Sequence, residues 1–320
     1  MKREIELLIN KSEITAGTRG SSLGPESIMA AARKNNSRFF SEYPIRHVQH
    51  MNHLLDEGVK YQYSKRIEGC IEVFKSVCVQ VKDIMMSKKF PIVIAADHGS
   101  AGGTLAGVKS ANPNNRLGVI WIDAHGDLHT PYTTPSGNMH GMPLATALNL
   151  DNLECQLNDI TIEEKEFWNT LKSTGVEGAK LAPEDLVYIA VRDTEKPEDQ
   201  LIERLNITNH TVDAIRKKGL DRIVEETVEQ LKDCDMIYLS FDVDAMDPEL
   251  TSHGTGTPVP NGLMPKEARY FLKEFAKLDK LVCMEFVEVN PCLDEKSNRM
   301  AEVTFDLLEA TTTELKQKWS

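Results

Sequence analysis

Short runs of consecutive apolar residues recur along the chain, and polar residues separate them. The runs are too continuous for strands with one solvated face, so they predict strands that are buried on both faces of a sheet. With the polar residues that end them, these runs are FPIVIAADHG (90–99), LGVIWIDAHGD (117–127), LVYIAVRD (186–193), MIYLSFDVDAMDP (236–248) and LVCMEFVEVNP (281–291).

Segments with helical periodicity lie between these runs. From residue 65 to 88, apolar side chains recur at intervals of three and four, and similar patterns cover about 198–218, 220–232, 265–277 and 297–317. Buried strands that alternate with helices predict an α/β protein with a mainly parallel sheet. We find no internal repeat, low-complexity tract or flexible linker, so we expect residues 1–320 to form a single domain.

One early segment, AGTRGSSLGPES from Ala16 to Ser27, has no apolar pattern. Its glycines indicate a loop, and GPES indicates a turn into a helix that continues to Arg33. A glycine-rich loop before a helix can bind phosphate. This loop lacks the GxxxxGK[ST] spacing, however, and no clear apolar strand leads into it. We therefore expect an ordinary surface loop.

Composition and charge exclude several classes of partner. The net charge of −12 argues against nucleic acid and anionic membranes, both of which attract basic surfaces. No uninterrupted apolar run of about 18 residues predicts a transmembrane helix, and the start MKREIELLIN does not resemble a targeting signal. The six cysteines are scattered without a CxxC pair, which is typical of reduced thiols. We expect a cytoplasmic protein.

The predicted strands share a chemical feature, because each one acquires acidic or histidine residues where it ends. Ligands of open α/β sheets bind beyond the carboxyl ends of the strands, so we expect these side chains to converge. In chain order, they are Asp97 and His98, then Asp123, His125 and Asp127, then Asp193 and Glu195, then Asp242 and Asp244, and finally Glu285 and Glu288.

Alternate residues of a strand share a face, so Asp123, His125 and Asp127 point in one direction, as do Asp242 and Asp244. Carboxylates this close repel one another unless a divalent cation neutralises them. A single DxD most often caps a helix or faces solvent. Together with AADHG, the two acidic motifs favour two ions that share bridging carboxylates. The oxygen-rich donor set favours Mn²⁺, and its imidazoles leave Zn²⁺, Ni²⁺ or Co²⁺ possible.

The motifs DAHGD, SGNMHG, SFDVDAMDP, GTGTP and EVNP, in this order between Asp97 and Pro291, resemble the ureohydrolase family of arginases and agmatinases. GPES and the helix after it are also similar to the family's N-terminal part. The resemblance is strongest to arginase. It implies a three-layer α/β/α fold, two manganese ions per subunit, a homo-oligomer (trimer or hexamer), and hydrolysis of a guanidino substrate to urea and an amine.

The resemblance also assigns ligands and catalytic residues. One ion would be held by His98, Asp123, Asp127 and Asp242, and the other by Asp123, His125, Asp242 and Asp244. Asp123 and Asp242 would bridge them, and a hydroxide between the ions would attack the guanidino carbon. The resemblance makes Asp127 the group that accepts a hydrogen bond from this hydroxide and passes on a proton, Glu288 the carboxylate that pairs with the guanidinium, and His140 a proton shuttle or substrate contact.

Further positions that match the arginase pattern predict how the rest of the substrate is held. HTPYTTPSGNMHG resembles the loop that contacts the carboxylate of an amino acid, and RDTEKPE resembles the segment that receives its ammonium group. The predicted substrate-binding residues are His129, Thr134, Ser136, Asn138, Glu195, Glu198 and Thr257.

Departures from the arginase pattern concern mainly the substrate. His129 stands where arginases usually have asparagine, Glu195 replaces an aspartate, and AADHG replaces the commoner glycine pair and GDHS. The segment between DAMDP and GTGTP is also one residue longer. We expect hydrolysis of L-arginine to L-ornithine and urea. The alternatives are agmatine, another guanidino acid or formiminoglutamate as substrate, and a metal-binding protein that has lost catalysis.

Overall fold

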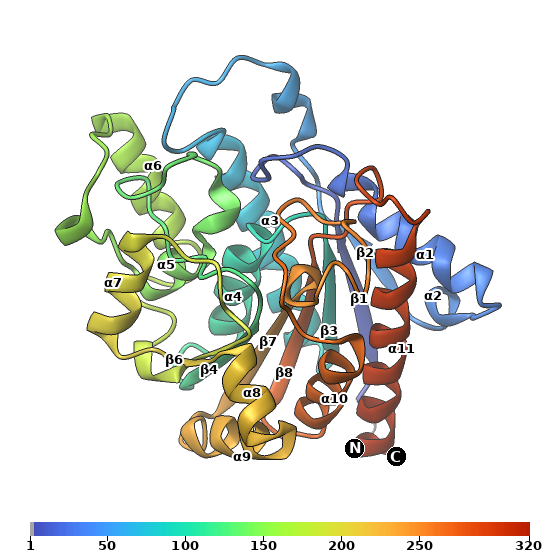
Figure 1. The fold of residues 1–320 in the computed structure, drawn as a ribbon. Coiled ribbons are helices and arrows are strands. Elements are labelled where there is room, and N and C mark those ends of the chain that lie inside the picture. Colours follow the sequence, from blue (N-terminus) through green and yellow to red (C-terminus); the bar gives the residue numbers. More distant parts are fainter. Residues whose placement is uncertain (1–2) are drawn as a thin grey trace.

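The fold is seen in a computed structural model that describes residues 3–320 (Figure 1). Within these residues, eight parallel strands form one sheet in the order β2-β1-β3-β8-β7-β4-β5-β6. The strands are β1 (Ile5–Asn10), β2 (Ile45–His47), β3 (Phe90–Ala95), β4 (Leu117–Ile122), β5 (Leu186–Ile189), β6 (Thr208–His210), β7 (Met236–Asp242) and β8 (Leu281–Val287).

Helices cover both faces of the sheet, because the strands send apolar side chains in both directions. In β4, Ile120 and Ile122 belong to one apolar core, whereas Val119 and Trp121 belong to the other. The first core is covered by α1 (Gly24–Lys34), α2 (Phe39–Glu42), α8 (Val212–Lys218), α9 (Leu220–Gln230), α10 (Pro265–Ala276) and α11 (Arg299–Trp319). The second core is covered by α3 (Ile67–Met86), α4 (Ser100–Ala111), α5 (Pro143–Leu148) and α7 (Lys196–Leu205), and α6 (Ile162–Lys172) packs beside α3. The predicted three-layer α/β/α architecture is confirmed.

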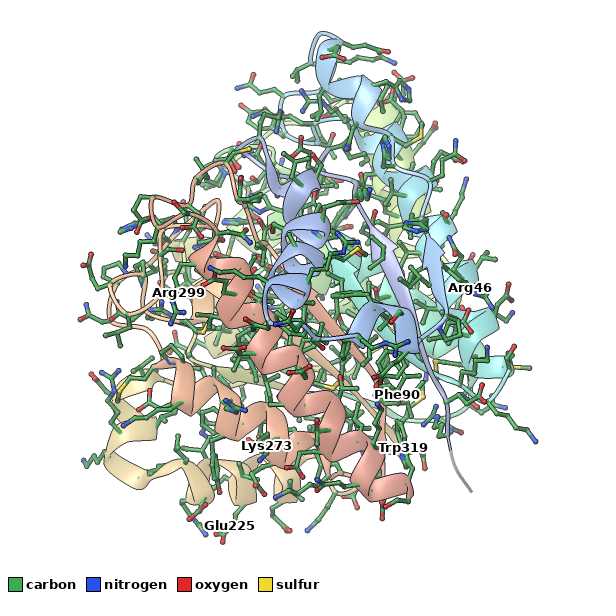
Figure 2. The ribbon with its side chains drawn as sticks, turned by 90° about the vertical axis from the view of Figure 1, so that its right-hand side faces the viewer. Arg46, Phe90, Glu225, Lys273, Arg299 and Trp319 are labelled. Atoms are coloured by element: carbon green, nitrogen blue, oxygen red, sulfur yellow. The ribbon has the colours of Figure 1, made fainter. Side chains whose placement is uncertain are left out.

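Helix α11 closes the first face along the length of the sheet (Figure 2). Its last residues reach the start of β3, where the ring of Trp319 lies 5.3 Å from that of Phe90. The helix also contacts α10 through an ion pair of 2.8 Å between Lys273 and Glu314. Because its apolar side chains Leu307 and Leu308 are buried in this core, the C-terminal helix packs on its own sheet.

Glycines allow α4 to approach α3 closely. A Cβ atom at Gly103 would lie 2.9 Å from the carbonyl oxygen of Phe74, and one at Gly107 would lie 2.7 Å from that of Cys78. Side chains at these positions would push the helices apart. This contact matters for function because α4 begins two residues after His98, at the carboxyl end of β3.

The structure also corrects several expectations. All five predicted strands are present, but β1, β2 and β6 were not predicted. The helix expected over 198–218 is interrupted by β6, a three-residue strand at the edge of the sheet. Strand β1 ends at Asn10, so an apolar strand does lead into the loop from Ala16. In residues 3–320, no helix is long and apolar enough to cross a membrane.

Candidate active site

A cleft of about 310 Å³ opens at the carboxyl ends of the central strands. Strands β3, β8, β7 and β4 are neighbours in the sheet, so the loops that follow them meet at one edge. At the bottom of the cleft lies a group that we call the carboxylate–histidine cluster, which consists of His98, Asp123, His125, Asp127, Asp242 and Asp244. At its mouth lies a group that we call the rim, which consists of His129, Thr134, Ser136, Asn138, Glu195 and Glu198.

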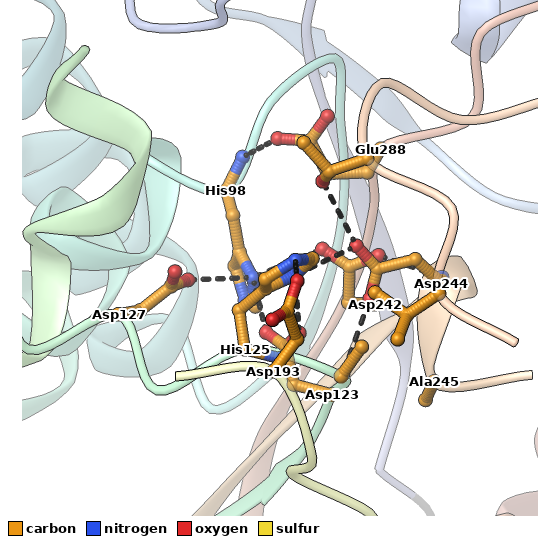
Figure 3. Close-up of polar contacts among 12 residues, drawn as sticks. His98, Asp123, His125, Asp127, Asp193, Asp242, Asp244, Ala245 and Glu288 are labelled. Atoms are coloured by element: carbon orange, nitrogen blue, oxygen red, sulfur yellow. Dashed lines mark hydrogen bonds and ion pairs between the residues drawn. The ribbon is translucent and has the colours of Figure 1, made fainter. Parts of the chain in front are cut away.

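The buried imidazole of His98 lies among three carboxylates (Figure 3). Its Nδ1 atom is 2.9 Å from an oxygen of Asp123, 3.1 Å from one of Asp127 and 3.2 Å from one of Asp242. These four residues come from the ends of three strands, and they are the set expected for the first ion. One ring nitrogen that faces three carboxylate oxygens is a suitable donor set for a cation.

A second group of donors surrounds His125, whose Nδ1 atom lies 3.0 Å from Asp244 and 3.6 Å from Asp123. In residues 3–320, two sets of three side chains could hold a metal ion: His98 with Asp123 and Asp127, and Asp123 with His125 and Asp244. Within each set, the candidate ligand atoms lie within 4.8 Å of one another. Asp123 belongs to both sets, which is the position of a bridging carboxylate.

The protein groups alone leave part of the cluster unsatisfied. Nδ1 of His98 and one Oδ atom of Asp127 are buried, and no hydrogen bond within residues 3–320 satisfies them. Burial and the nearby charge of Asp123 raise the pKa of Asp127 to about 6. Burial lowers the pKa of His98, but the three carboxylates of Asp123, Asp127 and Asp242 close to its ring outweigh it and raise that pKa well above its usual value. Aligned donors and unsatisfied buried atoms both fit a site for divalent cations.

Neighbouring side chains fix the orientation of the candidate ligands. Nε2 of His98 lies 2.7 Å from Oγ of Ser240, and its ring stacks on Trp121 at 4.1 Å. The indole N–H of Trp121 donates to Asp123 at 2.9 Å. Because Trp121 and Ser240 lie two residues before Asp123 and Asp242, the alternation of a strand places them on the same face as those ligands. Such outer contacts hold a metal ligand in one orientation.

Two carboxylate residues that line the cleft have left-handed backbone conformations, with a φ of 49° at Asp127 and 69° at Glu288. This region is unfavourable for residues other than glycine, and such residues cluster at functional sites. The main chain of Glu288 turns sharply after β8 here. As a result, its side chain points back over the cleft, where Oε1 accepts a hydrogen bond of 2.9 Å from the backbone N–H of His98.

His140 lies beside Glu288, with 3.4 Å between its Nδ1 atom and Oε1 of the carboxylate. Burial lowers the pKa of His140, but the hydrogen bond to Glu288 and the charges of Glu288, Asp127 and Asp97 outweigh it, so the pKa is raised above its usual value. An imidazolium near neutral pH can donate a proton. Thr257 also borders the cleft, and its hydroxyl donates to Asp244 at 3.3 Å.

Two hydrogen-bonding networks organise the rim. On one wall, Oγ1 of Thr134 accepts hydrogen bonds from the backbone N–H groups of Ser136 and Gly137, at 3.3 and 3.0 Å. On the other wall, Glu198 is buried and accepts hydrogen bonds from the backbone N–H groups of Leu128 and Glu195, at 3.0 and 3.1 Å. The first wall offers hydroxyl and amide groups, and the second is acidic.

His129 connects the DAHGD loop to the acidic wall. Its Nε2 atom lies 3.3 Å from the carboxylate of Glu198, and its Nδ1 atom lies 3.3 Å from the hydroxyl of Thr133. Burial lowers the pKa of His129, which favours the neutral imidazole. The carboxylate of Glu198 also accepts hydrogen bonds from two backbone N–H groups. The side chain of Glu195, in contrast, is exposed at the mouth of the cleft.

The N-terminal loop forms part of the cleft, so the expectation of an ordinary surface loop is wrong. Ala16, Gly17 and Thr18 line the cleft. The backbone N–H groups of Gly20 and Ser22 donate to the carboxylate of Glu13, at 2.8 and 2.9 Å. The donors that a phosphate would need are therefore occupied within the chain. The glycines of this segment were a signal for close approach to a site.

Two further strand-end residues have different outcomes. Glu285, expected to converge on the site, lies within β8 and accepts a hydrogen bond of 2.6 Å from Tyr238 in the interior of the protein. Asp193, also expected to converge, does line the cleft, with its carboxylate 3.7 Å from Nε2 of His125.

The fold and this site define a three-layer α/β protein with a candidate metal centre at the carboxyl edge of its sheet. The sequence profile described as "Arginase family" matches residues 8–313. The chain is 36% identical over 245 residues to an arginase of Bacillus caldovelox. The aligned residues cover 76% of this chain and 75% of that protein. It is 33% identical over 314 residues to an arginase of Brevibacillus brevis, and the aligned residues cover 97% of this chain and 98% of that protein.

The fold agrees with a solved structure as well. The crystal structure of arginase from Bacillus cereus superposes with a TM-score of 0.80 at 30% sequence identity, and it covers 97% of this chain and 98% of that one. The chain belongs to the arginase family. The predicted resemblance to ureohydrolases, and to arginase in particular, is confirmed.

Proposed function

We propose that this protein is a binuclear manganese arginase that hydrolyses L-arginine to L-ornithine and urea. The observation that carries this proposal is the pair of donor sets that share Asp123 at the bottom of a cleft. The lining of the same cleft includes both acidic side chains and hydroxyl and amide side chains. A cleft of this kind suits a substrate with a guanidinium group at one end and both charges of an amino acid at the other.

The carboxylate–histidine cluster supplies the ligands in this proposal. His98, Asp123, Asp127 and Asp242 would hold one ion, with Nδ1 of His98 within 3.2 Å of all three carboxylates. The second ion would be held by Asp123, His125, Asp242 and Asp244. Carboxylate-rich sites favour Mn²⁺. Two such ions, when bound, lower the pKa of water and supply a hydroxide nucleophile at neutral pH.

The side chains around the cluster would orient the substrate and move the proton. One oxygen of Glu288 accepts from the backbone of His98, and the carboxylate can pair with the planar guanidinium of the substrate. Water adds to the guanidino carbon, the bond from this carbon to Nε breaks, and Nε leaves as the amine of ornithine. Asp127 would accept a proton from the attacking water and return it to this leaving nitrogen. His140, whose pKa is raised, supplies a proton to the free amine.

At the rim, one wall would bind the carboxylate of the amino acid and the other wall would bind its ammonium group. Thr134, Ser136 and Asn138 would hold the carboxylate through hydroxyl and amide groups. Glu195 is exposed at the acidic wall and would receive the ammonium group, while the buried Glu198 supports the backbone there and holds His129.

The wider organisation is part of the proposal. Six free cysteines support a reducing compartment, the cytoplasm. The single sheet of residues 3–320 supports one domain over residues 1–320. We infer a homo-oligomer, trimer or hexamer, because the family resemblance implies one, and light scattering of the purified protein tests it.

Urea release from L-arginine tests the activity. The purified protein is stripped of metal with a chelator, reloaded with Mn²⁺, and given L-arginine, agmatine, other guanidino acids and formiminoglutamate in parallel. Urea is measured for the guanidino compounds, and formamide is measured for formiminoglutamate. We expect urea and ornithine from L-arginine, and about two manganese ions per chain by elemental analysis. Turnover of another substrate with none of L-arginine would overturn the proposed substrate. Failure of every substrate after reloading would overturn the enzymatic function.

A further inference from the structure

A lysine outside the predicted site contacts the rim. The segment before α3 crosses the loop of residues 133–138, and the backbone N–H of Lys65 donates to the carbonyl oxygen of Gly137 at 2.9 Å. Gly137 has a φ of 75°, and a Cβ atom there would lie 1.8 Å from the carbonyl oxygen of Gln62. The two segments are therefore in direct backbone contact, and only glycine fits at this position.

The side chain of Lys65 contacts the same wall. Its Nζ atom donates to Oδ1 of Asn138 at 3.2 Å. The other end of this amide faces the loop that lines the cleft, since a Cβ atom at Gly17 would lie 2.7 Å from Nδ2 of Asn138. An ammonium group only donates hydrogen bonds, so Lys65 holds the oxygen of the amide and leaves its NH₂ group on the side of the cleft. An NH₂ group is the end of an amide that a carboxylate requires.

The charge of Lys65 is unpaired within the described chain. No carboxylate of residues 3–320 lies within ion-pair distance of its Nζ atom, although the side chain is half-buried. Lys60, five residues earlier, contrasts with it, because its Nζ atom lies 3.2 Å from Glu163 and 3.6 Å from Glu68. An ammonium group without a carboxylate partner, beside a loop of hydroxyl and amide side chains, attracts a negative group on the ligand.

We propose that Lys65, from outside the lining of the cleft, determines specificity at the rim: it orients Asn138 and selects guanidino substrates that carry a carboxylate over those that lack one. This inference rests on the proposed function, since it concerns the carboxylate of the arginine substrate. Lys65 is a positioning residue for Asn138 and an electrostatic partner of the carboxylate. It takes no part in the reaction at the guanidino carbon.

The test compares ligands that differ only in the carboxylate. Lys65→Met, Lys65→Arg and the control Lys60→Met are assayed with L-arginine as substrate, and with L-ornithine and putrescine as competitive inhibitors. For Lys65→Met we expect KM for L-arginine and Ki for L-ornithine to rise about 3- to 30-fold. We expect kcat and Ki for putrescine to change less than about twofold. Lys65→Arg restores most of the affinity because it keeps the charge, and Lys60→Met behaves like the wild type.

The outcomes separate this inference from the proposed function. Equal weakening of L-ornithine and putrescine by Lys65→Met would show a merely structural role and overturn the inference. An unchanged Ki for L-ornithine would overturn it too, while arginine hydrolysis by the wild type still supports the proposed function. Failure of the wild-type enzyme to release urea from L-arginine would overturn the proposed function, and this inference with it.

Discussion

The two ends of the cleft are built differently. The carboxylate–histidine cluster lies at the ends of adjacent central strands, its four carboxylates are buried, and backbone and indole donors fix its side chains. The rim lies on loops and at the start of α7, where Glu195 and Ser136 are exposed. The resemblance places every predicted metal ligand in a family motif, although AADHG departs from the pattern beside His98. The departures that concern the substrate, His129 and Glu195, are both at the rim.

This difference suggests that the cluster sets the rate of the reaction, whereas the rim sets which substrate is preferred. A buried cluster tolerates little change, because removing one partner leaves other charges without compensation. Exposed loops tolerate change, and altered side chains there redirect binding. Substitutions in the cluster should therefore change the rate for every guanidine, and substitutions at the rim should change which guanidine is preferred.

The largest effect is expected at Asp127, which is both a candidate ligand and the proposed proton acceptor. Asp127→Asn keeps the shape of the side chain but removes its negative charge, so we expect kcat for L-arginine to fall about 100- to 10,000-fold. Steady-state urea release measures this change. Asp83→Asn, an exposed substitution on α3, is the control. Activity of Asp127→Asn close to that of the wild type would contradict the role of Asp127.

The next effect concerns pH and metal affinity. The pKa of Asp127 is raised to about 6 and that of His98 is raised above its usual value, so both groups keep protons to higher pH than they would in an unfolded chain. Metal binding must displace these protons, and affinity for Mn²⁺ should therefore fall as the pH falls from about 7.5 to 5.5, most steeply below the pKa of about 6 of Asp127.

Calorimetry in buffers of different ionisation enthalpy measures both the affinity and the number of protons released. Stability is a second readout, because a ligand at 100 times its Kd stabilises the folded state by about 2.7 kcal/mol per site. The melting temperature should rise on addition of Mn²⁺ at pH 7.5 and rise less at pH 5.5. Affinity that does not depend on pH would show that the cluster is not the binding site.

A smaller and selective effect is expected at His129. Asparagine at this position removes the contact of 3.3 Å with Glu198 and provides an amide for the carboxylate of the substrate. We expect His129→Asn to lower KM for L-arginine about 3- to 10-fold, with little change for agmatine. Parallel kinetics on the two substrates measure the ratio. A similar change for both would assign His129 a general structural role.

The smallest effect is expected at Glu195, which is exposed at the acidic wall. Glu195→Asp shortens the side chain by one methylene group and keeps its charge, and exposed ion pairs contribute at most about 1 kcal/mol. KM for L-arginine should change less than about fivefold, and kcat should remain constant. A large fall in kcat would mean that this residue belongs with the cluster, and the comparison between the two ends of the cleft would then fail.

Much of the fold could be predicted from apolar pattern alone. Five strands and the helices around residues 65–88, 220–232, 265–277 and 297–317 were found because their side chains are buried in long periodic runs. Strands β2 and β6 have three residues each, which is too short for a pattern. β1 begins among charged residues, and its burial depends on pairing with β3.

The sequence by itself determined the cluster, because alternation along a strand and the order of parallel strands bring Asp123, His125 and Asp242 to one edge of the sheet. It also determined the family, through long motifs near these residues. Only the tertiary structure decided which side chains support them. Contacts such as that of Lys65 with Asn138 join segments 73 residues apart, and no local periodicity specifies such a contact. The hydrogen bond that Tyr238 donates to Glu285 in the interior also joins residues far apart in the sequence, so local pattern did not predict it.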